Sequence, residues 1–341
     1  MIIDAHAHLV APDSLYAFRA RLLASSGWYR SSVNISNDSL RASANSNIHS
    51  MDAVGTDVQL ISPRPFHQMH SAQPRSIVHW WTETCNDLIA RTVEMYPARF
   101  AGLAALPTCD GADTVAALPE LDRTVTELGF IGVVLNPDPS EGAGCPPPLG
   151  DKYWYPLYER LVELDVPALI HAAGCTNGRE SYSNHFITEE SIAILSLLQS
   201  AVFTDFPTLR LMVSHGGGSV PYQIGRWQAE RLLPSLGGDP KAERFEVSLR
   251  KLWFDTVLHS PPSLDLLLKI VGPDRSLFGT ENPGSGSSIN PDTGRQFDDL
   301  RPIIESLTWL TPSHRKAIFE SNALEVFPAL AGRLALAEAK P

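Results

Sequence analysis

Residues 2–9 read IIDAHAHL, an apolar run that leads directly into two histidines two positions apart. The apolar residues at 2–4 predict a buried strand, and in extended backbone residues i and i+2 point to the same face. His6 and His8 can therefore present two imidazoles to one ion. An HxH tripeptide by itself is common by chance and more often marks surface histidines than metal ligands, so its meaning depends on where this strand ends in the fold.

Seven further short apolar runs bounded by turn residues predict buried strands. With the first, at 2–4, they are 58–62, 100–105, 131–136, 168–171, 211–214, 252–255 and 277–279. Segments of helical length and periodicity lie between them, at 80–95, 112–128, 154–164, 189–204, 222–233 and 262–270. Strands rich in Val, Ile and Leu that alternate with helices are typical of parallel βα units. Eight such units predict an α/β fold, a (β/α)₈ TIM-like barrel.

The 341 residues are expected to form one barrel domain, residues 1–328, because barrels of this kind routinely reach this length. The segment at about 10–50, rich in Ser, Asn and Arg, is too long for a plain βα loop and predicts an insertion after strand 1 that covers the barrel mouth as a lid. Residues 136–151, dense in Pro and Gly, predict an irregular loop. The C-terminal tail at 329–341 has an Ala/Leu helical pattern, and we expect it to dock on the outside of the barrel or to fray.

Composition and charge exclude several classes of function. The formal net charge of −11 argues against a nucleic-acid or anionic-membrane partner. The four cysteines form no CxxC pair, which fits free thiols in a reducing compartment. Gly216, Gly217 and Gly218 do not form a nucleotide-binding GxGxxG, and favour close packing around His215. Because no signal peptide or membrane-spanning apolar stretch is recognisable, we expect a soluble, cytoplasmic protein that acts on a small molecule.

Polar residues stand at the carboxyl ends of three later predicted strands. His171 ends ALIH, His215 ends LMVSH and Glu281 ends LFGTE. Active sites of these barrels lie at the carboxyl ends of the strands, so we expect these residues to meet His6 and His8. Each alone is more often a satisfied structural residue than a ligand. Together, two or three neutral imidazoles and a carboxylate make the ligand set of a catalytic divalent ion.

Other polar residues near the strand ends are candidates for substrate binding. Arg64, after the second strand, can form a bidentate fork with a carboxylate, although a surface salt bridge explains it equally. Arg226, at the start of the helix after VSHGGGSVPY, is a weaker candidate of the same type. Asn136 ends the fourth strand, and His67 and His70 share the loop region of Arg64, where they line the pocket or are solvated.

The motifs IIDAHAHL, ALIH, VSHGGG and LFGTE together resemble the amidohydrolase-2 branch of the amidohydrolase superfamily, which includes decarboxylases of aromatic and muconate acids. The resemblance runs nearly the whole chain. Longer runs are similar to the 4-oxalomesaconate hydratases of that branch, namely ISPRP, LNPDPS, PPLGDKYWYPLYERLVEL, SHGGGSVPYQIGRW and INPDTGRQFDD.

The resemblance implies His6, His8, His171 and Glu281 as ligands of one divalent metal ion. It implies catalytic roles for His215, as an acid/base, and for Glu281, whose identity as Glu matches the hydratases where the decarboxylases usually have Asp. Zinc is favoured by the mixed imidazole and carboxylate ligands, with iron and manganese as alternatives. Binuclear members supply a bridging Lys or Glu from strand four, which here ends in Val-Leu-Asn, so one metal is expected.

The implied reaction adds water to an unsaturated keto di- or tricarboxylic acid, with His215 relaying a proton and Arg64 holding a carboxylate. Phe186 stands where the hydratase-like chains have Tyr, and the missing phenol hydroxyl leaves the identity of the substrate open. The same ligands suit decarboxylation of an aromatic or muconate-type acid, or hydrolysis of an amide, lactone or thioester. A non-catalytic metal-binding barrel is the remaining alternative. Related enzymes lead us to expect a homodimer or larger homo-oligomer.

Overall fold

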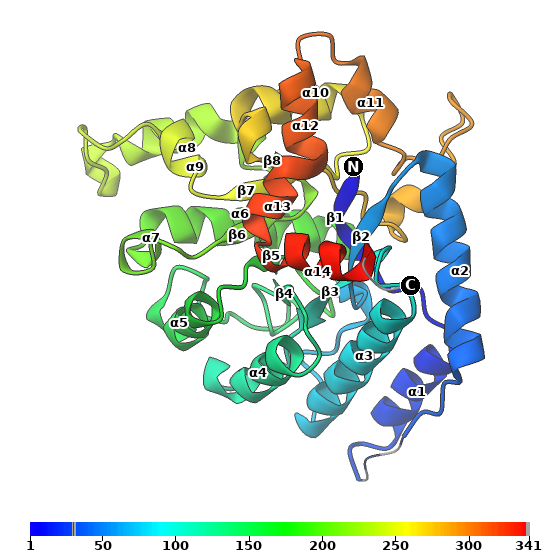
Figure 1. Ribbon diagram of the computed structural model, residues 1–341. Coiled ribbons are helices and arrows are strands. Elements are labelled where there is room, and N and C mark those ends of the chain that lie inside the picture. The colour runs from blue at the N-terminus through cyan, green and yellow to red at the C-terminus, as the bar shows by residue number, and fades with distance from the viewer. Residues whose placement is uncertain (29, 31, 339–341) are drawn as a thin grey trace.

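The centre of the molecule is a parallel eight-stranded sheet, in a computed structural model that describes residues 1–28, 30 and 32–338 (Figure 1). The strands, which pair in chain order, are β1 (Ile3–His8), β2 (Val58–Ser62), β3 (Phe100–Ala105), β4 (Gly132–Leu135), β5 (Ala168–Ile170), β6 (Leu211–Val213), β7 (Trp253–Asp255) and β8 (Ser276–Leu277). The residues after β8 return to β1. The amide of Ala5 donates to the carbonyl of Phe278 at 2.8 Å, and the amide of His8 donates to the carbonyl of Asn282 at 2.9 Å. These bonds close the sheet and confirm the predicted (β/α)₈ barrel.

Helices form a layer around the barrel (Figure 1). They are α1 (Asp13–Ala24), α2 (Asn37–Val54), α3 (Ser76–Met95), α4 (Leu118–Thr126), α5 (Tyr155–Glu163), α6 (Tyr182–Gln199), α7 (Val202–Asp205), α8 (Ile224–Arg231), α9 (Phe245–Leu249), α10 (Pro261–Ile270), α11 (Arg301–Ser306), α12 (Pro312–Lys316), α13 (Asn322–Val326) and α14 (Ala329–Glu338). A continuous apolar core between helices and strands holds them, with Trp81, Trp154 and Phe254 fully buried in it. Burial of such large side chains is the main favourable contribution to folding.

Two element boundaries differ from the predicted ones in ways that matter for the site. β1 continues past residues 2–4 through both histidines, because it stays paired with β2 as far as His8 and Ser62. α6 begins at Tyr182 rather than at 189, because the side chain of Ser181 accepts the amide of Asn184 and so caps the helix there.

The segment predicted as a lid, residues 10–50, contains α1 and most of α2, and its residues 29 and 31 lie outside the described part of the chain. Both helices pack beside α3 on the outside of the barrel. α1 also brings Tyr16 against His67, with 4.7 Å between ring centroids. This contact places α1 at the rim of the barrel mouth, and closure over the mouth stays a prediction.

α13 and α14 cover the amino-terminal end of the barrel, in front of the strands in Figure 1. Strand side chains such as Ile3, Leu60 and Met212 fill the barrel interior, and Leu330 and Leu334 of α14 pack against them. Most of the predicted tail is therefore a helix docked on the barrel, whereas residues 339–341 lie outside the described residues. The opposite end, where the strands finish, is left for the functional site.

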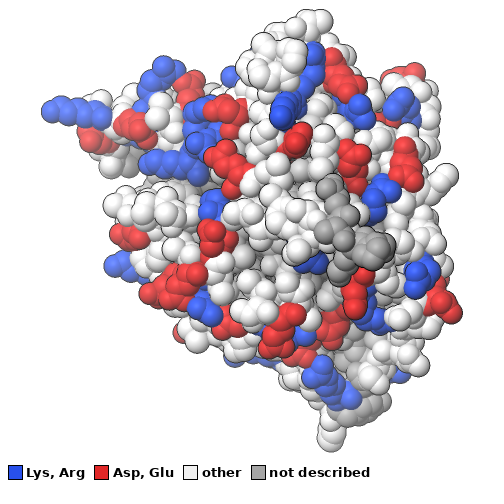
Figure 2. Space-filling view, viewed as in Figure 1, with Lys and Arg blue, Asp and Glu red and all other residues white. Residues whose placement is uncertain are grey.

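The surface at the amino-terminal end carries both signs of charge. Lys and Arg side chains lie interspersed with Asp and Glu over the face in Figure 2. This face therefore has no extended basic field of the kind that attracts a phosphate backbone. Within the described residues, no helix combines the length and apolar character needed to span a membrane.

Candidate active site

Four histidines and one carboxylate meet at the carboxyl end of the barrel. β1 carries His6 and His8, while His171, His215 and Glu281 follow β5, β6 and β8. The donor atoms of His6, His8 and His171 all lie within 4.8 Å of one another, as do those of His171, His215 and Glu281. All five side chains are buried. The structure therefore brings together the residues predicted as metal ligands and as catalytic groups.

Two of these imidazoles carry a buried ring nitrogen with no hydrogen-bond partner among the described residues, Nε2 of His6 and Nε2 of His171. The other ring nitrogen is held in each case. His6 Nδ1 lies 2.6 Å from Asp255 Oδ2, and His171 Nδ1 donates to the carbonyl of Ala172 at 2.7 Å. An acceptor at Nδ1 fixes the proton there and leaves the Nε2 lone pair free. Because an unpaired buried polar atom is costly, two in one cluster fit a site built to bind a metal ion.

His8 and His171 are held in the neutral form that metal ligation requires. Burial lowers the pKa of both imidazoles well below the usual value, and positive charge on neighbouring histidines adds to the effect. His8 Nδ1 also lies 3.0 Å from Ser62 Oγ at the end of β2, which orients its ring.

His215 has a different environment, because it lies between two carboxylates. Its Nδ1 lies 2.9 and 3.0 Å from the two oxygens of buried Glu190, and its Nε2 lies 3.4 Å from Glu281 Oε1. Burial acts to lower the pKa of His215, but the two carboxylates outweigh it and hold that pKa well above the usual value. Burial likewise acts to raise the pKa of Glu281, yet the hydrogen bond and charge of His215 lower it to about 2. The pair therefore holds a proton beside the metal donors.

The backbone is strained where these two side chains leave it. His215 has φ 51° and Glu281 has φ 62°, a left-handed conformation that residues other than glycine seldom adopt. Gly217, two residues after His215, has φ 83°, and a Cβ atom there would lie 2.7 Å from Phe254. The predicted close packing of the glycines around His215 is confirmed, and the strained turns aim both side chains at the cluster.

Two residues that support the site were missed from the sequence, Asp255 and Glu190. Asp255 is the last residue of β7, so the strand-end rule that found the other residues would have found it too. Its Oδ1 also accepts the amides of Gly216 at 2.9 Å and Val257 at 3.1 Å, which joins the ends of β6 and β7. Glu190 lies within α6, and no local pattern marks it.

A cavity of about 250 Å³ opens beside the donor cluster. It is lined by His8, Arg64, Pro65, Phe66, His67, His171, Tyr182, Phe186, Glu281, Pro283, Gly284 and Ser285. No carboxylate of the described chain forms an ion pair with Arg64. Phe186 stacks on His215, with ring centroids 5.6 Å apart and planes at 15°. Tyr182, one turn earlier on α6, places its hydroxyl 3.2 Å from Ser285 Oγ. The cavity thus combines an available guanidinium with an aromatic wall.

The structure does not bring three of the predicted substrate-binding residues to this cavity. Asn136 is buried and its side chain joins two loops, because it donates to the carbonyl of Asp138 and accepts the amide of Ala173. His70 is buried, with Nδ1 2.6 Å from the carbonyl of Thr108. Arg226 is exposed on α8, outside the barrel. The orientation of these three side chains depends on contacts with loops and helices beyond the strands. The position of a strand end therefore does not predict it.

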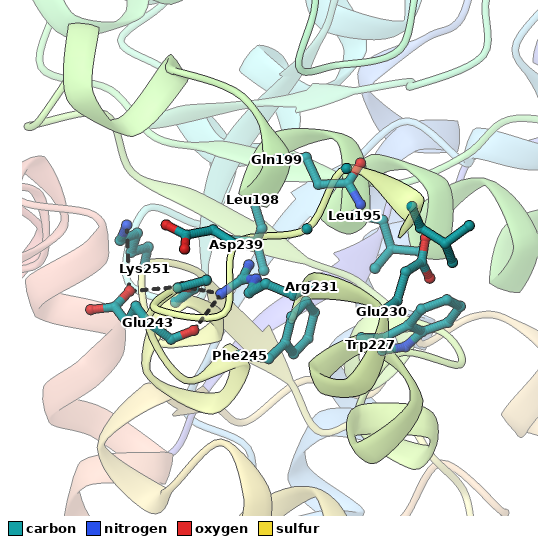
Figure 3. Close-up of a pocket in the computed structure, with 15 residues that line it drawn as sticks. Leu195, Leu198, Gln199, Trp227, Glu230, Arg231, Asp239, Glu243, Phe245 and Lys251 are labelled. Carbon is teal, nitrogen blue, oxygen red and sulfur yellow. Dashed lines mark hydrogen bonds and ion pairs between the residues drawn. The ribbon is translucent and has the colours of Figure 1, made fainter. Parts of the chain in front are cut away.

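A larger hollow of about 610 Å³ lies on the flank of the barrel, between α6, α8 and α9 (Figure 3). Part of its charge is already paired, because Nζ of Lys251 lies 3.9 Å from a carboxylate oxygen of Glu243. Arg231 donates to the carbonyl of Glu243 and to Ser248 Oγ, and its guanidinium lies 4.8 Å from the centre of the Phe245 ring. This hollow contains none of the five strand-end residues, so the smaller cavity is the candidate active site.

A closed parallel barrel with imidazole and carboxylate donors at its carboxyl end defines a class of enzyme whose site suits a divalent metal ion. The chain belongs to the amidohydrolase family, whose model matches residues 3–329, and it is an enzyme of that family.

Two relatives match over nearly the full length of both chains. The 2-keto-4-carboxy-3-hexenedioate hydratase of Sphingobium sp. is 37% identical, over 98% of each chain. The crystal structure of 4-oxalomesaconate hydratase from Rhodopseudomonas palustris has a TM-score of 0.87 and 35% identity, again over 98% of each chain. The fold also matches that of a dihydroxybenzoic acid decarboxylase from Polaromonas sp. solved with bound manganese, with a TM-score of 0.69 and 23% identity over 96% of this chain and 97% of that one.

Proposed function

We propose that this enzyme is a metal-dependent hydratase that adds water to the carbon–carbon double bond of an unsaturated keto di- or tricarboxylic acid. The observation that carries the proposal is the guanidinium of Arg64, which forms no ion pair within the described residues and lies in the same small cavity as His8, His171 and Glu281. A substrate with carboxylate groups at both ends fits one end on the guanidinium and the other on a cation. Two hydratases that match over nearly the full length support the choice of reaction.

The residues that would hold the metal ion are His6, His8, His171 and Glu281. Three imidazoles and a carboxylate favour zinc, with manganese and iron as alternatives. When bound, such an ion polarises substrate oxygens and makes water more acidic. The proposal includes one ion at this centre.

The residues around the cavity bind the substrate and transfer the proton that hydration requires. Arg64 binds a carboxylate through two parallel N–H donors. Burial and the positive charges of Arg64 and Arg19 lower the pKa of His67 to about 4, so His67 is a neutral hydrogen-bonding group beside that carboxylate. Hydration places a hydroxyl on one carbon and a proton on its neighbour. His215 holds a proton at Nε2, and Glu190 stabilises the protonated ring, so His215 is the group that relays it.

The test is direct conversion by the purified, zinc-loaded protein. We expect 4-oxalomesaconate or 2-keto-4-carboxy-3-hexenedioate to lose the absorbance of its conjugated double bond, with a hydroxy acid identified by NMR. In heavy-oxygen water the new hydroxyl should carry the label. Absence of turnover on both acids by a metal-loaded sample would count against the proposal.

Decarboxylation is the second candidate, and the aromatic wall of the cavity favours it. Phe66, Tyr182 and Phe186 offer ring faces to a planar aromatic acid, and Phe186 provides no hydroxyl. Release of carbon dioxide from a dihydroxybenzoic acid, without hydration of either keto acid, would show that the enzyme is a decarboxylase.

The expected partner is a small anionic substrate. A cytoplasmic location remains part of the proposal, and it is supported by the four cysteines, which are all free thiols. A homo-oligomer is likewise a prediction, which light scattering of the purified protein tests.

A further inference from the structure

A second group of metal-ligating side chains lies outside the catalytic cavity, where the loop after β4 meets α6. Asp138 belongs to the loop, and His185 and Glu189 lie one turn apart on α6. One donor atom from each lies within 4.8 Å of the other two. We propose that Asp138, His185 and Glu189 bind a second divalent cation of the zinc or manganese class, separate from the catalytic ion.

The surroundings of His185 are those expected of a metal ligand. The side chain is fully buried, and its Nε2 has no hydrogen-bond partner in the described part of the protein. This nitrogen lies 3.4 Å from Asp138 Oδ2. Two ligand atoms, each about 2.1 Å from a zinc ion at a tetrahedral angle, are about 3.4 Å apart. Glu189 is one helical turn along from His185, so its carboxylate lies on the same face of α6.

The alternative is a protonated His185 bridging two carboxylates. Its Nδ1 lies 3.3 Å from Glu180 Oε1, and its Nε2 lies 3.4 Å from Asp138. Charge-assisted N–H···O hydrogen bonds are shorter, at about 2.7–2.9 Å. Neither contact is a tight ion pair. The arrangement instead resembles a carboxylate that orients a histidine through Nδ1 while Nε2 faces a metal ion.

The charges around His185 also favour a cation. Three carboxylates surround it, those of Asp138, Glu180 and Glu189. Within the described residues, no Lys or Arg forms an ion pair with any of them. Asp138 Oδ2 accepts the amide of Gly142 at 2.6 Å and retains a second lone pair towards His185. A divalent ion would offset this concentration of negative charge.

A cation here would join the loop after β4 to the first half of α6. That half of the helix carries Tyr182 and Phe186, which line the catalytic cavity. The ion would therefore hold the aromatic wall in place and take no part in the reaction itself.

The experiment counts metal ions. Protein stripped with a chelator is equilibrated with zinc and its metal content measured by mass spectrometry. We expect two equivalents per chain in the wild type, one in E189Q and two in the matched control E159Q, whose side chain is exposed on α5. One equivalent in the wild type, or two in E189Q, would overturn the proposal.

A titration with cobalt(II) keeps the test decisive if E189Q does not fold. The double variant H6A/E281A removes two catalytic ligands and leaves the second cluster intact. We expect this variant to bind one equivalent of cobalt(II) and to gain thermal stability from it. Absence of binding by the folded double variant would contradict the proposal.

Discussion

The ligand histidines depend on the groups that hold their other ring nitrogens, and the closest of these contacts is between His6 and Asp255. Asp255→Asn keeps the Oδ1 acceptor for the amides of Gly216 and Val257, but it puts an amide where Nδ1 of His6 needs an acceptor. We expect metal affinity to fall about 10- to 100-fold. Competition with a chromogenic chelator measures it, with the exposed Asp292→Asn as control. Equal affinity in D255N and wild type would show that this contact does not orient His6.

Glu190 sets the protonation of His215. Its carboxylate helps to raise the pKa of His215, so the neutral amide in Glu190→Gln should lower that pKa. A raised native pKa keeps the imidazole charged until the pH rises through it, and the stability that this charge contributes is lost over the same rise. The alkaline limb of the kcat profile should therefore move to lower pH in E190Q, with metal content unchanged. An unshifted limb would mean that His215 does not relay the proton.

Arg64 is expected to bind substrate through a bidentate fork, which lysine cannot form. Arg64→Lys should raise KM about tenfold or more, while kcat changes less, because a group that binds a carboxylate which does not react contributes equally to ground-state and transition-state binding. Arg226→Lys is the matched control, since Arg226 is exposed on α8, and its steady-state constants should not change. A raised KM in R226K, with unchanged constants in R64K, would mean that Arg226 rather than Arg64 binds the substrate.

Among single residues, those that follow from strand ends were predictable and those that depend on side-chain contacts were not. His171, His215 and Glu281 could be found because the carboxyl ends of the strands meet at one end of the barrel. The left-handed turns that aim His215 and Glu281 at the cluster could not be predicted. Asn136 also ends a strand, but hydrogen bonds to neighbouring loops engage its amide. Glu190 reaches His215 from a helix, and only the packing of α6 against the barrel places it there.

At the scale of elements, α14 closes the amino-terminal end of the barrel. Leu330 is fully buried against the barrel interior, whereas Leu336 of the same helix is 70% exposed. Leu330→Ala should lower the free energy of unfolding by about 2–5 kcal/mol through lost burial and an added cavity, whereas Leu336→Ala should change it by less than about 0.5 kcal/mol. Denaturant titration measures both. Equal effects would mean that α14 is not docked as the structure has it.

Element existence could be predicted better than element limits. The apolar runs located the strands, and those at 58–62 and 100–105 have the predicted bounds. The start of α6 was missed because its first turn, around Tyr182, is polar and exposed, and a serine cap defines it rather than an apolar period. That early turn matters, because it carries part of the cavity wall.

At the scale of the whole molecule, the alternation of strands and helices predicted the closed barrel, because eight parallel units with both faces covered have few other solutions. The cavity could not be predicted in the same way. Arg64 and His67 were expected near it, but the other walls come from loops and helix starts that are far apart in sequence, among them Tyr182 and Ser285. Their arrangement depends on how the helices pack against the barrel.

The central claim is that three imidazoles and one carboxylate bind a single catalytic ion. Anomalous diffraction from crystals of the zinc-loaded protein, collected on both sides of the zinc absorption edge, tests it most directly. We predict a strong peak about 2.0–2.2 Å from Nε2 of His6, His8 and His171 and from a carboxylate oxygen of Glu281. A fully loaded crystal with no peak among these four side chains would contradict the account.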